Sequence, residues 1–130
     1  MEYAHNMLQI VGYFISSCIR RRNLLMQLEN MSYKDALTKL GNRFLVEKFV
    51  KRLDKNKCIG AVYCDITGLK NVNDTQGHEA GDKLILRASD CLKKIFSDYG
   101  IFRIGGDEFL VLCSEITEDD LYKKTEQLKE

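Results

Sequence analysis

Three acidic residues have types and spacing that could bind a divalent cation. Asp107 and Glu108 directly follow the glycine pair Gly105 and Gly106, and Asp65 closes a short apolar run. Hard cations such as Mg²⁺ are held by one or two carboxylates, a backbone carbonyl and substrate phosphates, so converging acids would imply a nucleotide as the missing ligand. A solvated acidic rim without a ligand is the alternative, and the residue types alone leave both interpretations open.

The acids can converge only if strands hold them, and the flanking sequence predicts those strands. Residues 100–104 and 109–113 are rich in β-branched and aromatic side chains, and the glycine pair between them predicts a tight turn with positive φ. The two acids after the glycines are therefore expected at a hairpin tip. Residues 58–66 form another short apolar run, which predicts a buried strand that ends in the third acid.

The remaining periodicity predicts helices around these strands. Apolar side chains at helical spacing predict one helix over residues 43–53, with Asp35 as a capping candidate. A loop or short helix is then expected before a longer helix that ends near Ile95. A final helix is expected after Thr117 or Glu118. The β-α-β-β-α order matches a ferredoxin-like unit that lacks its last strand, so the fold class is α/β in the α+β sense, with helices covering the sheet.

The amino-terminal segment has a different pattern. Residues 7–19 are largely apolar and precede three arginines, but thirteen residues are too few for a membrane span, which needs about 20. A heptad seam instead predicts a coiled-coil or domain-linking helix over residues 1–32, interrupted at Arg21. The seam consists of Met7, Val11, Phe14, Cys18, Leu25 and Leu28.

Composition narrows the class of partner. The chain has 130 residues, 45% of them hydrophobic, enough for one domain and an appendage. Twenty basic and nineteen acidic residues leave a net charge of +1, so no global field attracts nucleic acid, and none is expected as a partner. The five cysteines show no CxxC spacing, which favours a reduced chain in the cytoplasm.

The segment after the first strand adds groups that can bind phosphate and a base. Backbone amides near Gly68 and Leu69, with the cation of Lys70, can cradle phosphate oxygens opposite a metal, although Lys70 is otherwise an ordinary surface lysine. Asn73 and Asp82 are expected in a polar loop, and an amide with a carboxylate can meet the donor and acceptor edge of guanine. A turn with helix caps is the alternative for this stretch.

Three motifs resemble those of the GGDEF diguanylate cyclases. They are "DALTKLGNR" at 35–43, "DITGLKNVNDTQGHEAGD" at 65–82 and "RIGGDEF" at 103–109, in the order and approximate spacing of the family. The resemblance covers residues 33–130 and implies a domain of the GGDEF, nucleotide-cyclase type. It also implies that two such domains meet face to face as a homodimer, each holding one GTP, and join the two GTP molecules into cyclic di-GMP with loss of pyrophosphate.

The resemblance assigns roles by position. It implies a Mg²⁺ or Mn²⁺ site made by Asp65, the carbonyl of Ile66, Asp107 and Glu108, and a catalytic part for Asp107, which would help to deprotonate the attacking 3′-hydroxyl. The other implied roles are contacts with the nucleotide. They fall to Leu69 and Lys70 at the triphosphate, Asn73 and Asp82 at the guanine, and Gly105 and Gly106 where the backbone approaches the nucleotide.

The sequence also departs from the family pattern. Thr67 stands where a second acid is frequent, and Leu69 stands where Phe is frequent. Family members continue beyond the hairpin through a further strand and helix, so the domain is expected to be incomplete at its carboxyl end. Phe96 and Tyr99 occupy the places of an inhibitory Arg-x-x-Asp motif found in many members, so no inhibitory site is expected. Phe96 is instead predicted to be a core residue at the end of the long helix.

The amino-terminal helix resembles the exit helix of a sensor domain. An upstream sensor domain in a longer parent protein is therefore expected, with membrane tethering of that parent as one option. Two functions of different class remain. The first is a diguanylate cyclase domain, and the second is a catalytically inactive GGDEF module that binds GTP or a partner and regulates a neighbouring domain. The intact GGDEF sequence favours the first as the evolved role, and the expected missing carboxyl-terminal segment favours the second for this polypeptide.

Overall fold

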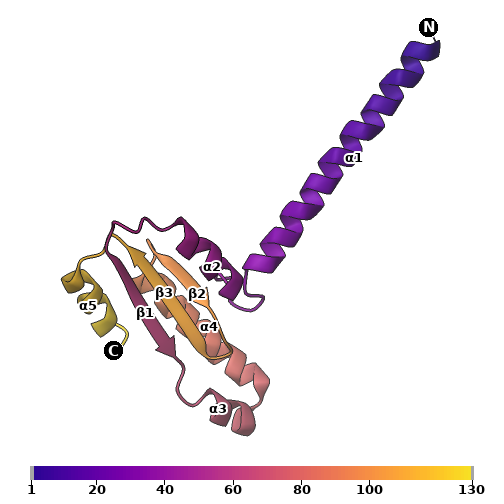
Figure 1. Cartoon of the computed structure of the whole chain (residues 1–130). Helices are drawn as coiled ribbons and strands as arrows, with labels where there is room; N and C mark the ends of the chain where they lie inside the picture. Colours follow the sequence, from indigo (N-terminus) through magenta and orange to yellow (C-terminus); the bar gives the residue numbers. More distant parts are fainter. Residues whose placement is uncertain (1, 130) are drawn as a thin grey trace. The chain divides into compact units, whose positions relative to one another are not determined.

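The computed structural model describes residues 2–129. The chain divides into two compact units, Met1–Ser32 and Tyr33–Glu130 (Figure 1). The first unit is formed by helix α1, which runs over Glu2–Tyr33, so the predicted long helix is confirmed. None of the described helices is both long and apolar enough to cross a membrane.

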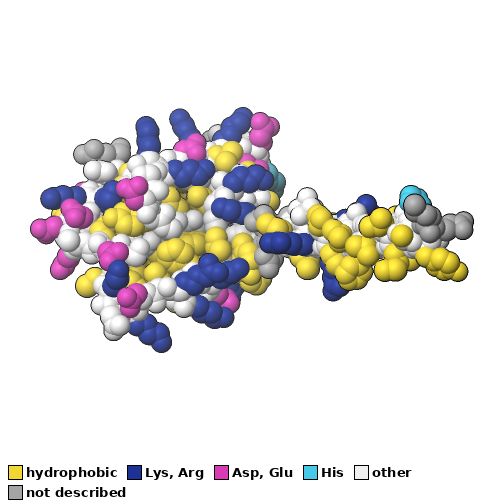
Figure 2. Space-filling view, turned by 90° about the horizontal axis from the view of Figure 1, so that it is seen from above, with side chains coloured by type: hydrophobic (Ala, Val, Ile, Leu, Met, Phe, Trp, Pro, Cys, Tyr) yellow, Lys and Arg dark blue, Asp and Glu magenta, His cyan; other side chains and the backbone are white. Residues whose placement is uncertain are grey.

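Many apolar side chains of α1 are exposed, and Figure 2 shows one face of the helix on which they gather. Within the predicted seam, Met7 is 67% exposed and Phe14 is 71% exposed. Leu8, Ile10 and Ile15 lie outside that seam and are also exposed. A helix that is apolar on more than one face is normally covered by other protein, so the coiled-coil role of α1 stays a prediction that this pattern favours.

The second unit is built on an antiparallel sheet of β1 (Ile59–Asp65), β2 (Gly100–Arg103) and β3 (Glu108–Ser114), in the order β1-β3-β2. The β2–β3 hairpin is confirmed. The prediction that the first strand is buried is wrong, because its side chains alternate between exposed and packed positions. Because successive side chains of a strand point to opposite faces, Val62 and Cys64 pack against the core whereas Ala61 and Tyr63 on the other face are exposed.

Helices lie on both faces of the sheet (Figure 1). On one face, α4 (His78–Ile95) packs onto β3, and the core they share consists of Ile85, Leu92, Phe96, Phe109, Val111 and Cys113 with Leu40 and Ile116. On the other face, α2 (Arg43–Arg52) packs onto β2, where Phe49 meets Phe102 edge to face with ring centroids 5.4 Å apart. This arrangement confirms the predicted α+β class.

The structure gives the starts of α3 (Leu69–Gln76), α5 (Glu118–Glu126) and α2, and two of these helices have side-chain caps. The short helix α3 precedes α4, and α5 begins at Thr117, whose hydroxyl accepts from the amide of Asp120. The expected cap at Asp35 is wrong. Helix α2 is capped by Asn42, whose Oδ1 accepts from the Leu45 amide at 3.1 Å, because Asp35 is seven residues too early and closes a separate turn.

Replacing Phe96 with alanine tests the core at the end of α4. The Phe96 side chain is fully buried, as predicted, so removing it should lower the free energy of unfolding by about 3 to 5 kcal/mol. Urea unfolding of the full chain, followed by circular dichroism, measures the loss. Phe44→Ala is the matched control, because Phe44 is 62% exposed and should change stability by about 0.5 kcal/mol or less. Equal losses in the two variants would contradict this packing.

Candidate functional site

The strand register brings the predicted acids to one end of the sheet. Asp65 is the last residue of β1 and lies opposite Glu108, the first residue of β3. The Ile66 amide donates to the backbone carbonyl of Asp107 at 2.9 Å, so the chain after β1 stays beside the hairpin turn. The end of the sheet where β1 finishes and β3 begins therefore carries Asp65, Asp107 and Glu108, and we name it the acidic rim.

The neighbouring acids of the rim contribute to a raised pKa at Asp65. The pKa of Asp65 is raised, first by partial loss of solvent and then by the negative charge of Asp107, by a hydrogen bond between these two carboxyl groups and by the charge of Glu108. A raised carboxyl pKa next to two further acids means that like charges are held close together. A cation bound among them would relieve that repulsion.

Glu108 has a partner that the sequence did not suggest. The Tyr63 hydroxyl donates to Oε1 of Glu108, and this hydrogen bond is the main reason why the pKa of Tyr63 is raised to about 12. Oε2 of Glu108 lies against Gly105, where a Cβ atom would collide with it. Within residues 2–129, no three His, Cys, Asp or Glu side chains are grouped so that they could hold a metal ion.

The hairpin turn is fixed by Arg103. Its Nη2 and Nε donate to the carbonyl of Gly106 at 2.8 and 3.3 Å, and its Nη1 donates to both carboxylate oxygens of Asp35 at 3.1 and 3.2 Å. The Arg103 and Asp35 side chains are only 13% and 20% exposed. Asp35 also accepts from the amide and the hydroxyl of Thr38, each at 2.8 Å. One guanidinium thus ties the hairpin tip to the segment before α2.

The predicted positive φ at the hairpin glycines is wrong. Among the described residues, the glycines with positive φ are Gly68 and Gly77. The hairpin turn is closed differently, because the amides of Ile104 and Gly105 both donate to the carbonyl of Glu108, at 3.0 and 3.4 Å. A side chain at Gly105 would have to displace the Glu108 carboxylate, which lies in the space that its Cβ atom would need.

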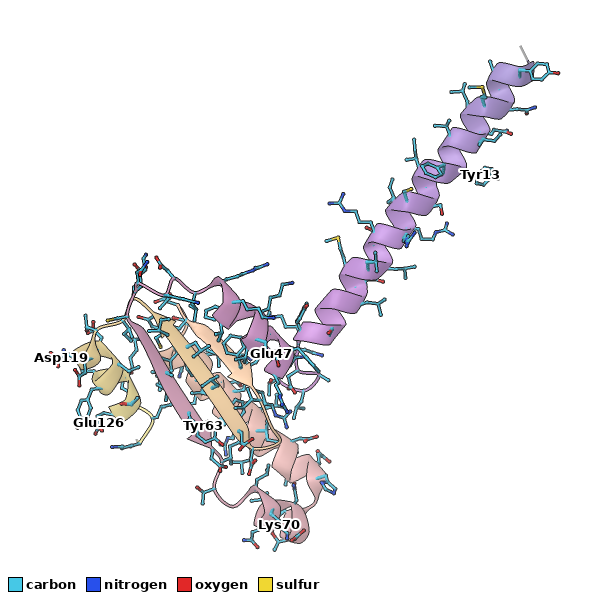
Figure 3. All side chains as sticks on the ribbon, viewed as in Figure 1. Tyr13, Glu47, Tyr63, Lys70, Asp119 and Glu126 are labelled. Atoms are coloured by element: carbon cyan, nitrogen blue, oxygen red, sulfur yellow. The ribbon has the colours of Figure 1, made fainter. Side chains whose placement is uncertain are left out.

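The predicted phosphate contacts lie at the start of α3. Gly68, with φ of 82°, precedes the helix, and no side chain caps it, so the first amides of α3 have no capping acceptor. Leu69 and Lys70 are the first two residues of the helix, and the Lys70 side chain is exposed (Figure 3). Free amides next to an exposed ammonium group suit an anion.

The predicted base contacts do not lie in a loop. Asn73 is part of α3 and Asp82 is part of α4, so the predicted polar loop is wrong. The two helices are joined at Gly77, where φ is 87°. They pack so closely that Oδ1 of Asn73 fills the space a Cβ atom would take at Gly81. The Asn73 side chain therefore lies next to the residue that precedes Asp82.

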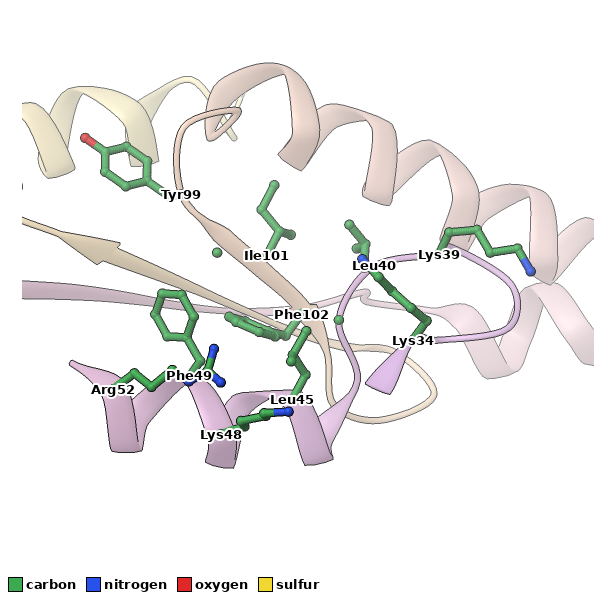
Figure 4. A pocket seen from close by; sticks show the side chains of 12 residues that line it. Lys34, Lys39, Leu40, Leu45, Lys48, Phe49, Arg52, Tyr99, Ile101 and Phe102 are labelled. Carbon is green, nitrogen blue, oxygen red and sulfur yellow. The ribbon is translucent and has the colours of Figure 1, made fainter. Parts of the chain in front are cut away.

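A separate pocket of about 370 Å³ lies between α2 and β2 (Figure 4). Its lining includes the apolar side chains of Leu45, Phe49 and Phe102 together with four basic residues. The basic residues are Lys34, Lys39, Lys48 and Arg52. None of the residues predicted to bind nucleotide or metal lines this pocket, so the candidate site is the open acidic rim with the adjoining start of α3.

Comparison with known proteins decides the family. Residues 32–130 match the sequence profile described as diguanylate cyclase, GGDEF domain. The chain belongs to the GGDEF-domain family. An uncharacterized membrane protein of Staphylococcus haemolyticus is 34% identical over 116 residues, which cover 82% of this chain and 32% of that protein. The chain thus spans about a third of the length of the curated relatives it matches.

Solved structures show the same fold as this GGDEF chain. The coiled coil and GGDEF domain of DgcB from Caulobacter crescentus, in complex with cyclic di-GMP, superposes with a TM-score of 0.82 at 22% identity, covering 91% of this chain and 65% of that one. The diguanylate cyclase SiaD of Pseudomonas aeruginosa, in complex with its activator SiaC, has a TM-score of 0.66 at 25% identity, covering 98% and 53%. Both likenesses include the GGDEF fold.

Asp35→Asn tests the bridge that holds the hairpin tip. Burial would raise the pKa of Asp35, but hydrogen bonds from Thr38 and the contact with Arg103 outweigh it and lower the pKa below 3.8. At neutral pH the variant should lose about 1 to 3 kcal/mol of stability, because Arg103 keeps a poorly compensated charge. Urea unfolding of both proteins, repeated from neutral to acid pH, measures the difference.

The sign of the pH dependence follows from the lowered pKa. Ionised Asp35 stabilises the fold at every pH above its unfolded pKa, and this contribution is lost as the pH falls through the folded pKa below 3.8. The stability gap between the natural protein and Asp35→Asn should therefore narrow in acid. The exposed Asp98 provides the control Asp98→Asn, which should cost little at any pH. A gap that stays constant down to the lowest pH would rule out this bridge.

Proposed function

We propose that this chain is the catalytic domain of a diguanylate cyclase. In this reaction the 3′-hydroxyl of each GTP attacks the α-phosphorus of the other, two pyrophosphates leave and cyclic di-GMP is formed. The observation that carries the proposal is that strand register brings Asp65 opposite Glu108 and keeps the next residue, Ile66, hydrogen-bonded to Asp107, shortly before the uncapped start of α3. Membership of the GGDEF family supports it.

Two carboxylates, a backbone carbonyl and substrate phosphates can together hold a Mg²⁺ or Mn²⁺ ion, so the acidic rim fits one when GTP is present, although no three His, Cys, Asp or Glu side chains of residues 2–129 are grouped around one point. The donors are oxygens, which hard cations prefer, and the carboxyl groups of Asp65 and Asp107 are already close enough to raise the pKa of Asp65. We assign the ion to Asp65, the carbonyl of Ile66, Asp107 and Glu108. When bound, such an ion neutralises charge that builds up on the attacking and leaving oxygens. Asp107 accepts the proton of the 3′-hydroxyl.

The triphosphate and the guanine of GTP are assigned to α3 and α4. The free amides of Leu69 and Lys70, with the Lys70 ammonium, bind the triphosphate at the start of α3. Asn73 and Asp82 are assigned to the guanine edge, an assignment supported by the packing of α3 on α4, which puts the Asn73 side chain against Gly81, the residue before Asp82. Gly106 leaves open space beside the hairpin tip, because a Cβ atom there would meet nothing within 4 Å.

The reaction needs two copies of the site, so we assign a homodimer. The apolar seam of α1 is the element of this chain suited to pairing two copies. The matched relatives are named as membrane proteins and are about three times as long as the matched segment, which supports a longer, membrane-tethered parent with an upstream sensor domain and this domain on the cytoplasmic side. If GTP binds without turnover, the chain is instead a GGDEF module that regulates a neighbour.

Asp65→Asn tests the cation site. The variant should lose metal-dependent binding of a non-hydrolysable GTP analogue, because one of the close carboxylates is gone. It should not unfold the domain, since Asp65 is exposed and its removal relieves like-charge repulsion. Calorimetry with excess Mg²⁺ and with a chelator measures the dependence, and the exposed Asp98→Asn is the control. Equal binding of the analogue by the natural protein with and without Mg²⁺ would reject the cation site.

The choice of base tests the α3–α4 assignment. Adenine presents an acceptor where guanine has its N1 hydrogen, so ATP should lose at least one hydrogen bond, about 1 to 3 kcal/mol, and bind several-fold to a hundred-fold more weakly than GTP. Asp82→Ala should remove most of this preference. Asp90→Ala on the exposed face of the same helix is the control and should keep it. Similar affinities for GTP and ATP in the natural protein would exclude Asn73 and Asp82 as the guanine-binding residues.

A further inference from the structure

Tyr63 lies on the exposed face of β1, close to the acidic rim (Figure 3). It is two residues before Asp65, so both side chains are on the same face of the strand. Across the ladder Tyr63 faces Leu110 and Asp65 faces Glu108. Glu108 is therefore the diagonal neighbour of Tyr63 on β3, at a distance that an aromatic side chain can span.

One oxygen of the Glu108 carboxylate is held by a hydrogen bond, and the other lies beside the hairpin turn. The Tyr63 hydroxyl donates to Oε1, and Oε2 rests against Gly105 in the space a side chain would otherwise fill. A glutamate side chain at a strand end normally samples several rotamers. Here the hydrogen bond from Tyr63 restricts it to the rim, where strand pairing sets Glu108 opposite Asp65.

We propose that Tyr63 is a positioning residue for the cation site, and this inference rests on the proposed function. Its hydroxyl occupies one lone pair of Oε1 and leaves the remaining lone pairs of Glu108 for the ion. Hydrogen-bond partners behind a metal ligand fix its orientation, and their removal typically weakens metal binding ten-fold to a hundred-fold.

The contact has little to do with the stability of the fold. Tyr63 is 58% exposed and does not belong to the hydrophobic core. Its ring would remain in a phenylalanine variant, so only the hydrogen bond to Glu108 is removed. A change in cation binding without a change in unfolding would thus separate positioning from packing.

The test is a Mg²⁺ titration of the full chain with a non-hydrolysable GTP analogue, followed by calorimetry. Tyr63→Phe should raise the Mg²⁺ concentration for half-maximal binding about ten-fold, with analogue affinity at saturating Mg²⁺ and urea unfolding without metal both unchanged. Tyr122→Phe is the matched control, because Tyr122 is 65% exposed on α5 and loses the same atom away from the rim. It should titrate like the natural protein.

A double-mutant cycle with Glu108→Gln makes the result specific. If Tyr63 acts through Glu108, adding Tyr63→Phe to Glu108→Gln should cause no further loss of Mg²⁺ affinity, whereas independent effects would add. Additive losses, an unchanged titration for Tyr63→Phe or a tighter one would each overturn the proposal, the last by showing that the hydroxyl competes with the ion. Metal-independent binding by the natural protein would instead reject the cation site itself, and the role of Tyr63 with it.

Discussion

The arrangement of the acidic rim depends on the hydrogen bonds that the guanidinium of Arg103 donates. This guanidinium bonds the Gly106 carbonyl at the hairpin tip and both oxygens of Asp35, and Asp35 in turn holds Thr38. The planar guanidinium has fixed donor directions, so it sets orientation as well as distance, which a lysine ammonium could not do. Because the ion pair is largely removed from solvent, losing either partner leaves a charge that water compensates poorly.

Strand register is the second constraint on the site. Asp65 is opposite Glu108, and Tyr63 lies on the same face two residues earlier, only because β1 and β3 pair in this register. Side chains alternate along a strand, so a slip of one residue would move Asp65 and Tyr63 to the face that packs on α4. Burying Asp65 against that apolar core would be costly, and the same acids that form the rim therefore help to specify the pairing.

Local patterns predicted the elements well, and contacts between distant residues were not predictable. The hairpin and the bounds of α2 follow from periodicity and turn residues. The stretch that forms α3 was expected as a loop or a short helix, because its sequence, "LKNVNDTQ", has too few apolar residues to show a period. The contact of Asn73 with Gly81, which packs α3 on α4, is not visible in the sequence. The partners of Tyr63 and Arg103 are 45 and 68 residues away in the chain. The alternation of β1 could have suggested that Tyr63 shares a face with Asp65, but not that it reaches Glu108.

The two edges of the sheet are not equivalent. Along the outer edge of β2, the amide of Gly41 donates to Ile101 and the carbonyl of Gly41 accepts from Arg103, so a loop already occupies it. Strand β1 pairs with β3 alone among the described strands, and it contains neither lysine nor proline, which would disfavour pairing with a further strand. The sheet can therefore grow in one direction only. Any strand that joins it, from the same polypeptide or from another molecule, must run alongside β1, and at the carboxyl end of β1 it would lie next to the acidic rim.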